Sequence, residues 1–326
     1  MVDILFFVIY SDNVLPNQIP KNVTILYKSN HKYNFIFLFN IFFKKIKNLF
    51  SSPFTFFHFF SYHTIFAEIV NKHFLDNINL KKIKKVIMPY EGQPFQNFIF
   101  KNIKNQNKKI KTVGFIHSMI PALPLNFIKR DGAPDILYVS GLSQKNIFVK
   151  YLGWNNMDIN IIRSIRIKKK IRKNQHQTFY FPMNIFKLNE IYSSIDKYLN
   201  FFKKNSLPVF QIKKHPQMLN ISEQIVLSKK INFLFFNYKD KFSKKVKKKI
   251  SFFLGPTSSF VQFLENSIES IHFTSMPALD LYTNMLWSYI KPVEVSHDIY
   301  RYSLLKKNKI IKLSNENYNL KTAKIL

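Results

Sequence analysis

The chain has 326 residues, 46% of them hydrophobic, and a formal net charge of +32. This length suits about two domains with buried cores, and the hydrophobic content excludes a wholly disordered chain. Because the chain contains no cysteine, disulfides, thiolate metal ligands and a cysteine nucleophile are also excluded.

The positive charge comes mostly from lysine, which weakens the case for a nucleic-acid-binding protein. Basic surfaces attract polyanions, but only five of the 50 basic residues are arginine, the residue that makes bidentate contacts to phosphate and guanine. Lys, Asn, Ile and Phe, the residues that A/T-rich codons encode, are abundant, so codon composition alone can explain much of the lysine charge. We therefore expect no specific nucleic-acid partner and consider anionic lipid the better target for the charge.

The N-terminal part contains three apolar stretches that do not predict membrane spans. Residues 1–13 contain Asp3 and no basic residue, so they predict a first strand and not a signal peptide. The run at 33–43 is too short to cross a bilayer, and polar residues interrupt the run at 50–70. We interpret residues 50–70 as a buried helix pair or, alternatively, an interfacial helix.

Short apolar runs then alternate with longer amphipathic stretches, which is the pattern of parallel β-sheets with crossover helices. In the first half this predicts strands at 3–10, 23–27, 85–88, 112–116, 136–139 and 159–163, and helices at 95–104 and 144–152. A basic segment at 166–177 predicts a linker or exposed turn. The second half predicts strands at 178–181, 208–213, 232–236, 250–254 and 270–273, and a helix at 188–204.

Two such halves predict an α/β chain of two Rossmann-like domains that face each other across a cleft. We place the domains at residues 1–170 and 171–326. Folds of this kind bind ligands at the carboxyl ends of their strands, often between domains. The candidate functional residues are therefore those that directly follow a predicted strand.

Two loops of the first half carry such residues. Glu91 follows a strand and is placed to act as a general base, while Gly92 permits a tight turn. Alternatively, Glu91 only caps a helix that begins near Pro94. His117 also follows a strand, where an imidazole can bind substrate or transfer protons, or can be an ordinary structural histidine.

The first such loop of the second half is basic. Lys213, Lys214, His215 and Pro216 follow a strand directly, and the proline biases His215 toward an extended conformation. Two lysines and a histidine would neutralise a phosphate, although a lysine-rich chain also produces basic loops without function.

The second loop combines a turn with hydroxyl side chains. Gly255 and a proline follow a strand, and Thr257, Ser258 and Ser259 stand at the start of a predicted helix. Hydroxyls and amides at a helix N-terminus form an anion site. The same residues also serve as ordinary N-caps, which does not exclude anion binding.

Other familiar nucleotide and metal motifs are missing from the sequence. It contains neither a nucleoside-triphosphate P-loop nor a GxGxxG fingerprint. The nine histidines are scattered without HExxH spacing. A mechanism without metal is therefore the simpler expectation.

In their order and their placement after strands, Glu91-Gly92, His215-Pro216 and Ser258-Ser259 resemble the motifs of a known family. It comprises bacterial GT-B sialyltransferases and capsule transferases that use CMP-activated acidic sugars. The family has an acidic pair before glycine in the first domain, then His-Pro and Ser-Ser/Thr pairs in the second. The resemblance covers most of the chain in architecture but only these three dipeptides in motif.

This resemblance implies an inverting, metal-independent glycosyltransferase of bacterial surface polysaccharide synthesis that needs no cofactor. Glu91 would deprotonate the acceptor hydroxyl, and His215 would contact the phosphate of the leaving CMP. The residues expected around the nucleotide are Lys213, His215, Pro216, Gly255, Thr257, Ser258 and Ser259. Those expected on the acceptor side are Tyr90, Gly92, Gln93 and Ser118.

The chain departs from the family at one position, where Tyr90 and Glu91 replace the acidic pair. If the family's base is the first residue of the pair, that position holds Tyr90 in this chain. Glu91 or His117 must then act as the base instead. A UDP-sugar transferase, a CDP-polyol phosphotransferase and a basic nucleic-acid or membrane-surface binding protein stay open as alternatives. The expected partners are a nucleotide-sugar donor and a glycan or lipid-linked glycan acceptor. The expected location is the cytoplasm, with peripheral contact to the anionic inner membrane as an option.

Overall fold

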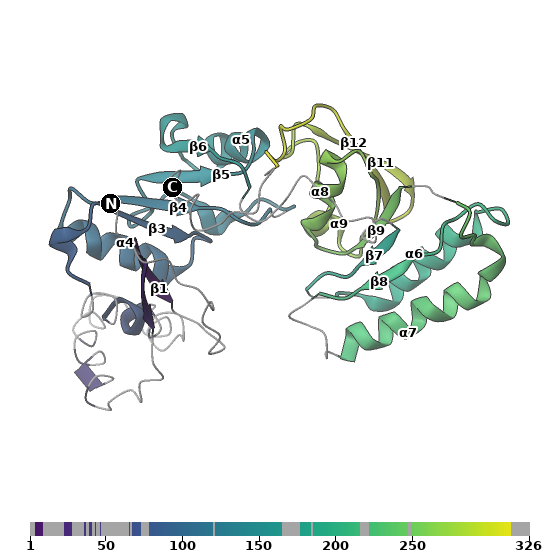
Figure 1. Cartoon of the computed structure of the whole chain (residues 1–326), viewed down its shortest axis with the longest axis horizontal. Coiled ribbons are helices and arrows are strands. Elements are labelled where there is room, and N and C mark those ends of the chain that lie inside the picture. Colours follow the sequence, from purple (N-terminus) through teal and green to yellow (C-terminus); the bar gives the residue numbers. More distant parts are fainter. Residues whose placement is uncertain are drawn as a thin grey trace. The chain divides into compact units, whose positions relative to one another are not determined.

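The computed structural model describes residues 4–8, 23–27, 36, 39, 40, 43, 46, 65, 67–72, 78–119, 121–164, 177–183, 185–215, 222–246 and 249–313. Figure 1 labels their helices and strands, and their contacts form two compact units. Unit 1 contains the described residues of 1–115 and 129–137, and unit 2 contains those of 116–128 and 138–317. This grouping differs from a linear division at residue 170, although the two larger sheets lie on either side of that residue in the sequence.

The first of these sheets is parallel and has four strands in the order β3-β4-β5-β6. The strands are β3 (Lys85–Pro89), β4 (Lys111–Phe115), β5 (Ile136–Val139) and β6 (Ile159–Ile161). The crossover helices are α4 (Pro94–Gln106) and α5 (Leu142–Tyr151), with short 3-10 turns at Leu80–Lys82, Leu125–Phe127 and Asn156–Asp158. All four strands and both helices agree with the predicted pattern to within a few residues. A separate parallel pair, β1 (Ile4–Val8) and β2 (Val23–Tyr27), was also predicted.

The second larger sheet has six strands in the order β11-β12-β10-β9-β7-β8. Its parallel part is β7 (Thr178–Tyr180), β8 (Gln211–Lys213), β9 (Ile250–Leu254) and β10 (Glu269–Phe273), and the antiparallel hairpin is β11 (Ile290–Ser296) and β12 (Ile299–Leu304). The helices are α6 (Leu188–Asn200), α7 (Ser222–Asn237), α8 (Ser259–Glu265) and α9 (Pro277–Asp280), with a 3-10 turn at Lys239–Lys241. The α/β class is confirmed, and the hairpin makes this sheet mixed.

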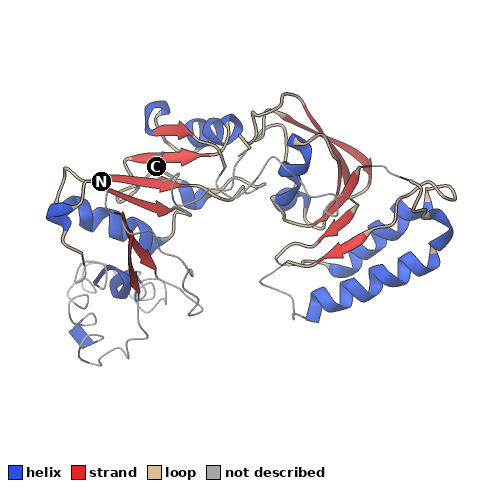
Figure 2. Ribbon diagram, viewed as in Figure 1, coloured by secondary structure: helices blue, strands red, loops and turns tan. Residues whose placement is uncertain are grey.

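The strand predicted at 232–236 is wrong, because these residues form the end of helix α7 (Figure 2). Their Phe-rich composition has high β propensity. The buried residues of α7 nevertheless recur at helical spacing, with Leu227, Ile231 and Leu234 fully covered. Packing of this helical face outweighs the local preference for a strand.

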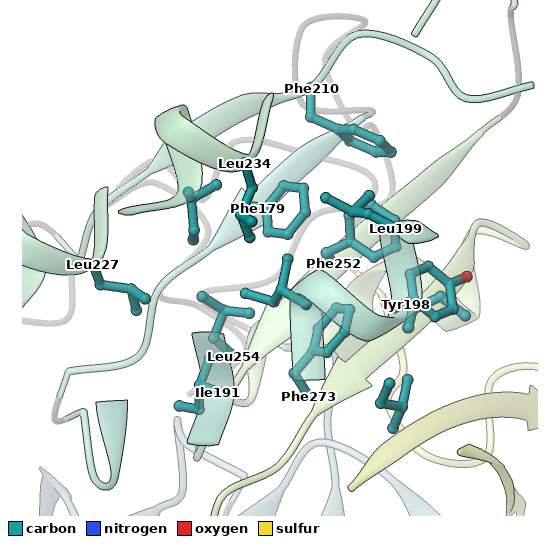
Figure 3. Packing of buried hydrophobic residues seen from close by; sticks show 14 of the residues in the cluster. Phe179, Ile191, Tyr198, Leu199, Phe210, Leu227, Leu234, Phe252, Leu254 and Phe273 are labelled. Carbon is teal, nitrogen blue, oxygen red and sulfur yellow. The ribbon is translucent and has the colours of Figure 1, made fainter. Parts of the chain in front are cut away.

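An aromatic core fixes the parallel strands of the second sheet (Figure 3). The rings of Phe179 in β7 and Phe252 in β9 have centroids 4.5 Å apart, and Phe210 lies at the same distance from Phe252. This face packs against α6 and α7. The next residues along the strands point the other way, so Tyr180 and Phe253 pack against Phe263 of α8. The sheet therefore lies between two helical layers, which fixes where its strands end.

The chain after the hairpin returns to the β5–α5 region, and this explains the make-up of unit 2. The buried carboxylate of Glu265 accepts the amide hydrogens of Asn308, Ile310 and Ile311 at 2.6–3.2 Å. Burial raises the pKa of Glu265, although these amides oppose the shift. Beyond this anchor, the amide of residue 312 donates to the carbonyl of Ser140. Elements distant in sequence thus pack as one unit.

Several predictions fall on residues that the structure does not describe. The proposed linker at 166–177 lies outside the described residues except for Gln177, and most of 33–43 and 50–70 does so too. Among the helices that the structure does describe, none has the length and apolar character needed to cross a bilayer.

Candidate functional site

In unit 1, Tyr90 belongs to the core. Its side chain is completely buried, its hydroxyl donates to Asn97 Oδ1 at 2.8 Å, and its ring packs on Phe100. Burial raises the pKa of Tyr90 to about 12 against the opposing charge of Arg130. A Cβ on Gly114 would lie 2.8 Å from the Cβ of Tyr90. Because Tyr90 has this structural role and is not exposed, we do not carry it forward as an acceptor-side residue.

The loop after β3 is held by Gln96 of α4. Its Oε1 accepts the amide hydrogens of Glu91 and Gln93 at 2.9 and 3.0 Å, and its Nε2 donates to the carbonyl of Pro89 at 2.7 Å. The helix begins at Pro94, as predicted, with Gln93 as the N-cap. Capping is thus done by glutamines, so it does not account for the carboxylate of Glu91.

Arg130, which lies between the Leu125–Phe127 turn and β5, contacts this loop and was missed by the sequence reasoning. Gly92 adopts φ +68°, which favours glycine, and its carbonyl accepts a hydrogen bond from Arg130 Nη2 at 3.3 Å. The guanidinium therefore places a permanent positive charge beside the segment that contains Glu91. The available signal was the rarity of arginine in a lysine-rich chain.

His117 and Ser118, which belong to unit 2, follow β4. The carbonyl of Ser118 accepts from Gln144 Nε2 at 3.0 Å, and Gln144 Oε1 accepts the amide of Ser140 at 3.1 Å. His117 is half-buried. The backbone at His117 is thereby tied to the start of α5, and a proton-transfer role for its imidazole stays a prediction.

In the second sheet, a buried glutamine of α7 holds the backbone of the loop after β8. Gln224 of α7 accepts the amide hydrogen of His215 at 3.2 Å and donates to the carbonyl of Pro182, after β7, at 2.9 Å. The Lys213 ammonium lies 5.4 Å from the centre of the Tyr180 ring. Pro216 lies outside the described residues. Gln224, which the sequence reasoning also missed, thus joins the ends of two neighbouring strands.

The loop after β9 lies against the same proline. Gly255 adopts φ +54°, and a Cβ on it would be 3.4 Å from Pro182 Cγ. Thr257 Oγ1 accepts the amide of Ser259 at 3.3 Å, so Thr257 partly fulfils the predicted capping role. Within the described residues, the side chain of Ser258 makes no capping hydrogen bond. Helix α8 has only seven residues, so the hydroxyls and the loop matter more here than the helix dipole.

A buried histidine fixes the Gly255 turn. His272 of β10 donates from Nε2 to the carbonyl of Gly255 at 2.7 Å, and its Nδ1 accepts from the Tyr302 hydroxyl at 2.9 Å. The oxygen of Tyr302 in turn accepts the amide of Tyr282 at 3.4 Å. Burial lowers the pKa of His272 to about 4. The imidazole is therefore neutral at pH 7 and acts as a fixed support for the loop.

A buried carboxylate also lies near Gly255. Asp280 of α9 is 1% exposed, and its Oδ2 accepts the amides of Ser275 and Met276 at 3.2 and 3.4 Å. Among the described residues, neither Asp280 Oδ1 nor Ser275 Oγ has a hydrogen-bond partner. A Cβ on Gly255 would lie 4.0 Å from Asp280 Oδ2. Burial raises the pKa of Asp280, and at 1% exposure its carboxylate is a structural acceptor for the turn at Ser275 and Met276.

The loops of the second sheet thus meet around Pro182, although they are far apart in sequence. Between them they offer the His215 imidazole and the hydroxyls of Thr257 and Ser258. Phosphate needs such donors and positive charge. In the described ranges, no three His, Cys, Asp or Glu side chains come together as a metal site requires.

A hollow of unit 2 lies elsewhere, beside α5. It has a volume of about 310 Å3 and is lined by residues that include Lys150, Tyr151 and Met285. None of its lining residues is a predicted site residue. We give more weight to the strand-end cluster, because parallel α/β sheets bind ligands at that edge.

Comparison of the chain with known proteins adds no family assignment, since no family model matches it and the search of curated proteins finds no significant match.

Proposed function

We propose that the chain is an inverting glycosyltransferase that transfers an acidic sugar from a CMP-sugar to a surface glycan or its lipid-linked precursor. The enzyme works in the cytoplasm, where nucleotide sugars are made, and meets its acceptor at the inner membrane. The two domains of this proposal take the GT-B arrangement, with the donor nucleotide bound by the second sheet.

One observation supports this proposal above all others: His215 is linked through Gln224 to Pro182, and Gly255 lies against the same Pro182. The sequence resemblance rests on residues at these two places. The buried supports Gln224 and His272 hold the loops in position. Donors fixed in advance around a leaving phosphate stabilise the charge that develops in the transition state.

The resemblance assigns the residue roles in this proposal. His215, Lys213 and Ser258 bind the leaving phosphate. Glu91 or His117 removes the proton from the acceptor. Arg130 neutralises part of the negative charge near Glu91.

A turnover assay tests the proposal. The purified enzyme is incubated with a CMP-linked nonulosonate or a CMP-linked Kdo-type sugar and a lipid-linked glycan, and CMP release and glycan mass are followed. We expect His215→Ala to reduce turnover by about 100-fold or more. The matched control is His297→Ala, which removes an exposed histidine at the β11–β12 turn and leaves turnover unchanged. Equal turnover by the His215→Ala variant and the wild type would refute the site.

The same assay separates the alternatives. CDP-glycerol or a UDP-sugar replaces the CMP-sugar in parallel reactions, and consumption of either one alone would replace our donor assignment. Glu91→Gln and His117→Gln then identify the base, because loss of a general base costs about 100-fold to 10,000-fold in rate. If only one of the two variants loses turnover, the residue replaced in that variant is the base.

A further inference from the structure

We infer that the ends of α6 and α7 form a docking surface for anionic lipid bilayers. Helix α7 presents a stripe of exposed residues at helical spacing, opposite the buried Leu227, Ile231 and Leu234. The stripe consists of Val226, Lys229, Phe233, Phe236 and Asn237. We call it the α7 stripe. Phe233 and Phe236 are 58% and 69% exposed, which is unusual for phenylalanine.

A third phenylalanine lies where α6 ends. Phe201 is 79% exposed. The ends of the two helices are neighbours, because Lys241, just after α7, donates to the carbonyls of Leu199 and Asn200 at 3.0 and 2.7 Å. The amide of Asn205 also donates to the carbonyl of Asp240 at 2.9 Å. Exposed apolar side chains from both helices therefore gather at one end of unit 2.

Positive charge surrounds these phenylalanines. Residues 196–206 and 229–245 contain nine lysines and two aspartates, a net charge of +7. Exposed lysines follow both helix ends in the sequence, among them Lys203, Lys204, Lys244 and Lys245. The Lys239 ammonium lies 5.6 Å from the centre of the Phe236 ring.

This combination fits a negatively charged bilayer. Interfacial helices bury an apolar face at the headgroup boundary while lysines pair with anionic lipid. A lysine beside a ring covers it with its methylenes and keeps its charge at the headgroup level. Bare electrostatic binding to nucleic acid would not need three exposed phenylalanines.

The surface lies at the amino ends of β7, β8 and β9, because helices that follow parallel strands run back to that end. The proposed nucleotide site lies at their carboxyl ends. A bilayer bound at the helix ends would thus leave the nucleotide site open. The assignment of the surface rests on geometry alone, and only its use in presenting a lipid-linked acceptor rests on the proposed function.

Vesicle sedimentation tests this surface. The full chain is mixed with vesicles of phosphatidylglycerol and phosphatidylcholine, or of phosphatidylcholine alone, at low and high salt. We expect binding to the anionic vesicles only, with release at high salt. The double variant Phe233→Ser/Phe236→Ser should weaken binding by about tenfold or more, because two rings no longer insert. Lys244→Glu/Lys245→Glu should also weaken it.

Matched controls remove similar side chains elsewhere. Met157→Ser/Met285→Ser removes two exposed methionines, and Lys108→Glu/Lys109→Glu reverses two exposed lysines of unit 1; both should bind vesicles like the wild type. Three outcomes would overturn the surface: full binding by the phenylalanine variant, equal losses in the controls, or self-association through the α7 stripe without vesicle binding. Nucleotide titration of the same variants reports separately on the proposed function.

Discussion

The carboxyl-edge loops of the two larger sheets are held in different ways. After β3, Gln96 of the following helix accepts the amides of the loop, and the loop's own Tyr90 is buried and bonded to Asn97. After β8 and β9, the buried supports also connect separate elements, since Gln224 bonds both His215 and Pro182, and His272 of β10 bonds Gly255. Because buried residues hold the backbone of these loops, the loop side chains at the carboxyl edge of the sheet stay available for a ligand. Substitution of Tyr90 in the first loop should therefore change mainly stability, whereas substitution of the residues that support the second-sheet loops should change stability and ligand binding together.

The largest effect on this comparison is expected from His272→Leu. The substitution leaves the carbonyl of Gly255 and the hydroxyl of Tyr302 without their buried partner, which should cost roughly 2–4 kcal/mol of unfolding free energy. It should also weaken nucleotide binding, because the Gly255 turn loses its anchor. Urea unfolding and nucleotide titration measure the two effects.

Tyr302→Phe is the control for His272→Leu. It removes the hydroxyl bound to His272 but keeps the bond from His272 to Gly255. We expect a loss of stability with unchanged nucleotide affinity. If both variants weakened the affinity equally, His272 would have no specific role in holding the turn.

The pH dependence of stability tests the neutral state of His272. Its pKa is about 4 in the folded chain and 6.5 as the unperturbed value. Above pH 6.5 His272 is neutral in both the folded and the unfolded state, so its contribution to stability is fully present. As the pH falls from 6.5 to 4, the unfolded state gains a proton that the folded state does not, so stability should fall by about 3 kcal/mol.

Other groups titrate in the same range, so the comparison is with His272→Leu, in which this contribution is absent. The wild-type stability should fall more steeply than that of the variant between pH 6.5 and 4, as urea unfolding at a series of pH values would show. Parallel curves would mean that the pKa of His272 is the same in the folded and unfolded states.

Tyr90→Phe probes the first loop. The variant keeps the buried ring and removes the hydrogen bond to Asn97, so it should cost about 1–2 kcal/mol of stability. Nucleotide affinity and turnover, corrected for the folded fraction, should not change. Loss of turnover in fully folded protein would show that the Tyr90 hydroxyl takes part in the reaction.

The smallest effects are expected at two glycines with positive φ. Gly255→Ala places a Cβ on a residue with φ +54°, and Gly153→Ala places one on a residue with φ +74°. Neither added Cβ would lie closer than 3.4 Å to a neighbouring atom. Each should cost about 1 kcal/mol of stability. Only Gly255→Ala should also weaken nucleotide binding, as parallel titrations would reveal. Equal nucleotide affinity in the two variants would show that the Gly255 turn is not part of the nucleotide site.

The sequence predicts the parallel strands well because each is a compact apolar run between polar turns. The bounds predicted for β2, β5 and β9 agree with the structure residue by residue. The run at 232–236 misleads, because helix packing decided over local β propensity. The β11–β12 hairpin was missed because its residues are mostly exposed or half-exposed, so the apolar signal is weak.

The site is only partly visible in the sequence for a similar reason. His215 and Ser258 follow strands, a signal that one sequence contains. His272 lies inside an apolar strand and resembles a core residue until its contact with Gly255 is seen. The meeting of the loops at Pro182 depends on the strand order β8-β7-β9, which no local pattern specifies.

The most direct test of the account is a titration of CMP, CDP, UMP and UDP against the wild type, His215→Ala and Ser258→Ala, with Glu91→Gln as control. We predict that CMP binds most tightly and that each of the first two variants weakens it tenfold or more, about 1.4 kcal/mol, while Glu91→Gln leaves it unchanged. A preference for UDP would keep the site and replace the donor. Absence of nucleotide binding, or CMP affinity unchanged in both variants, would contradict the account.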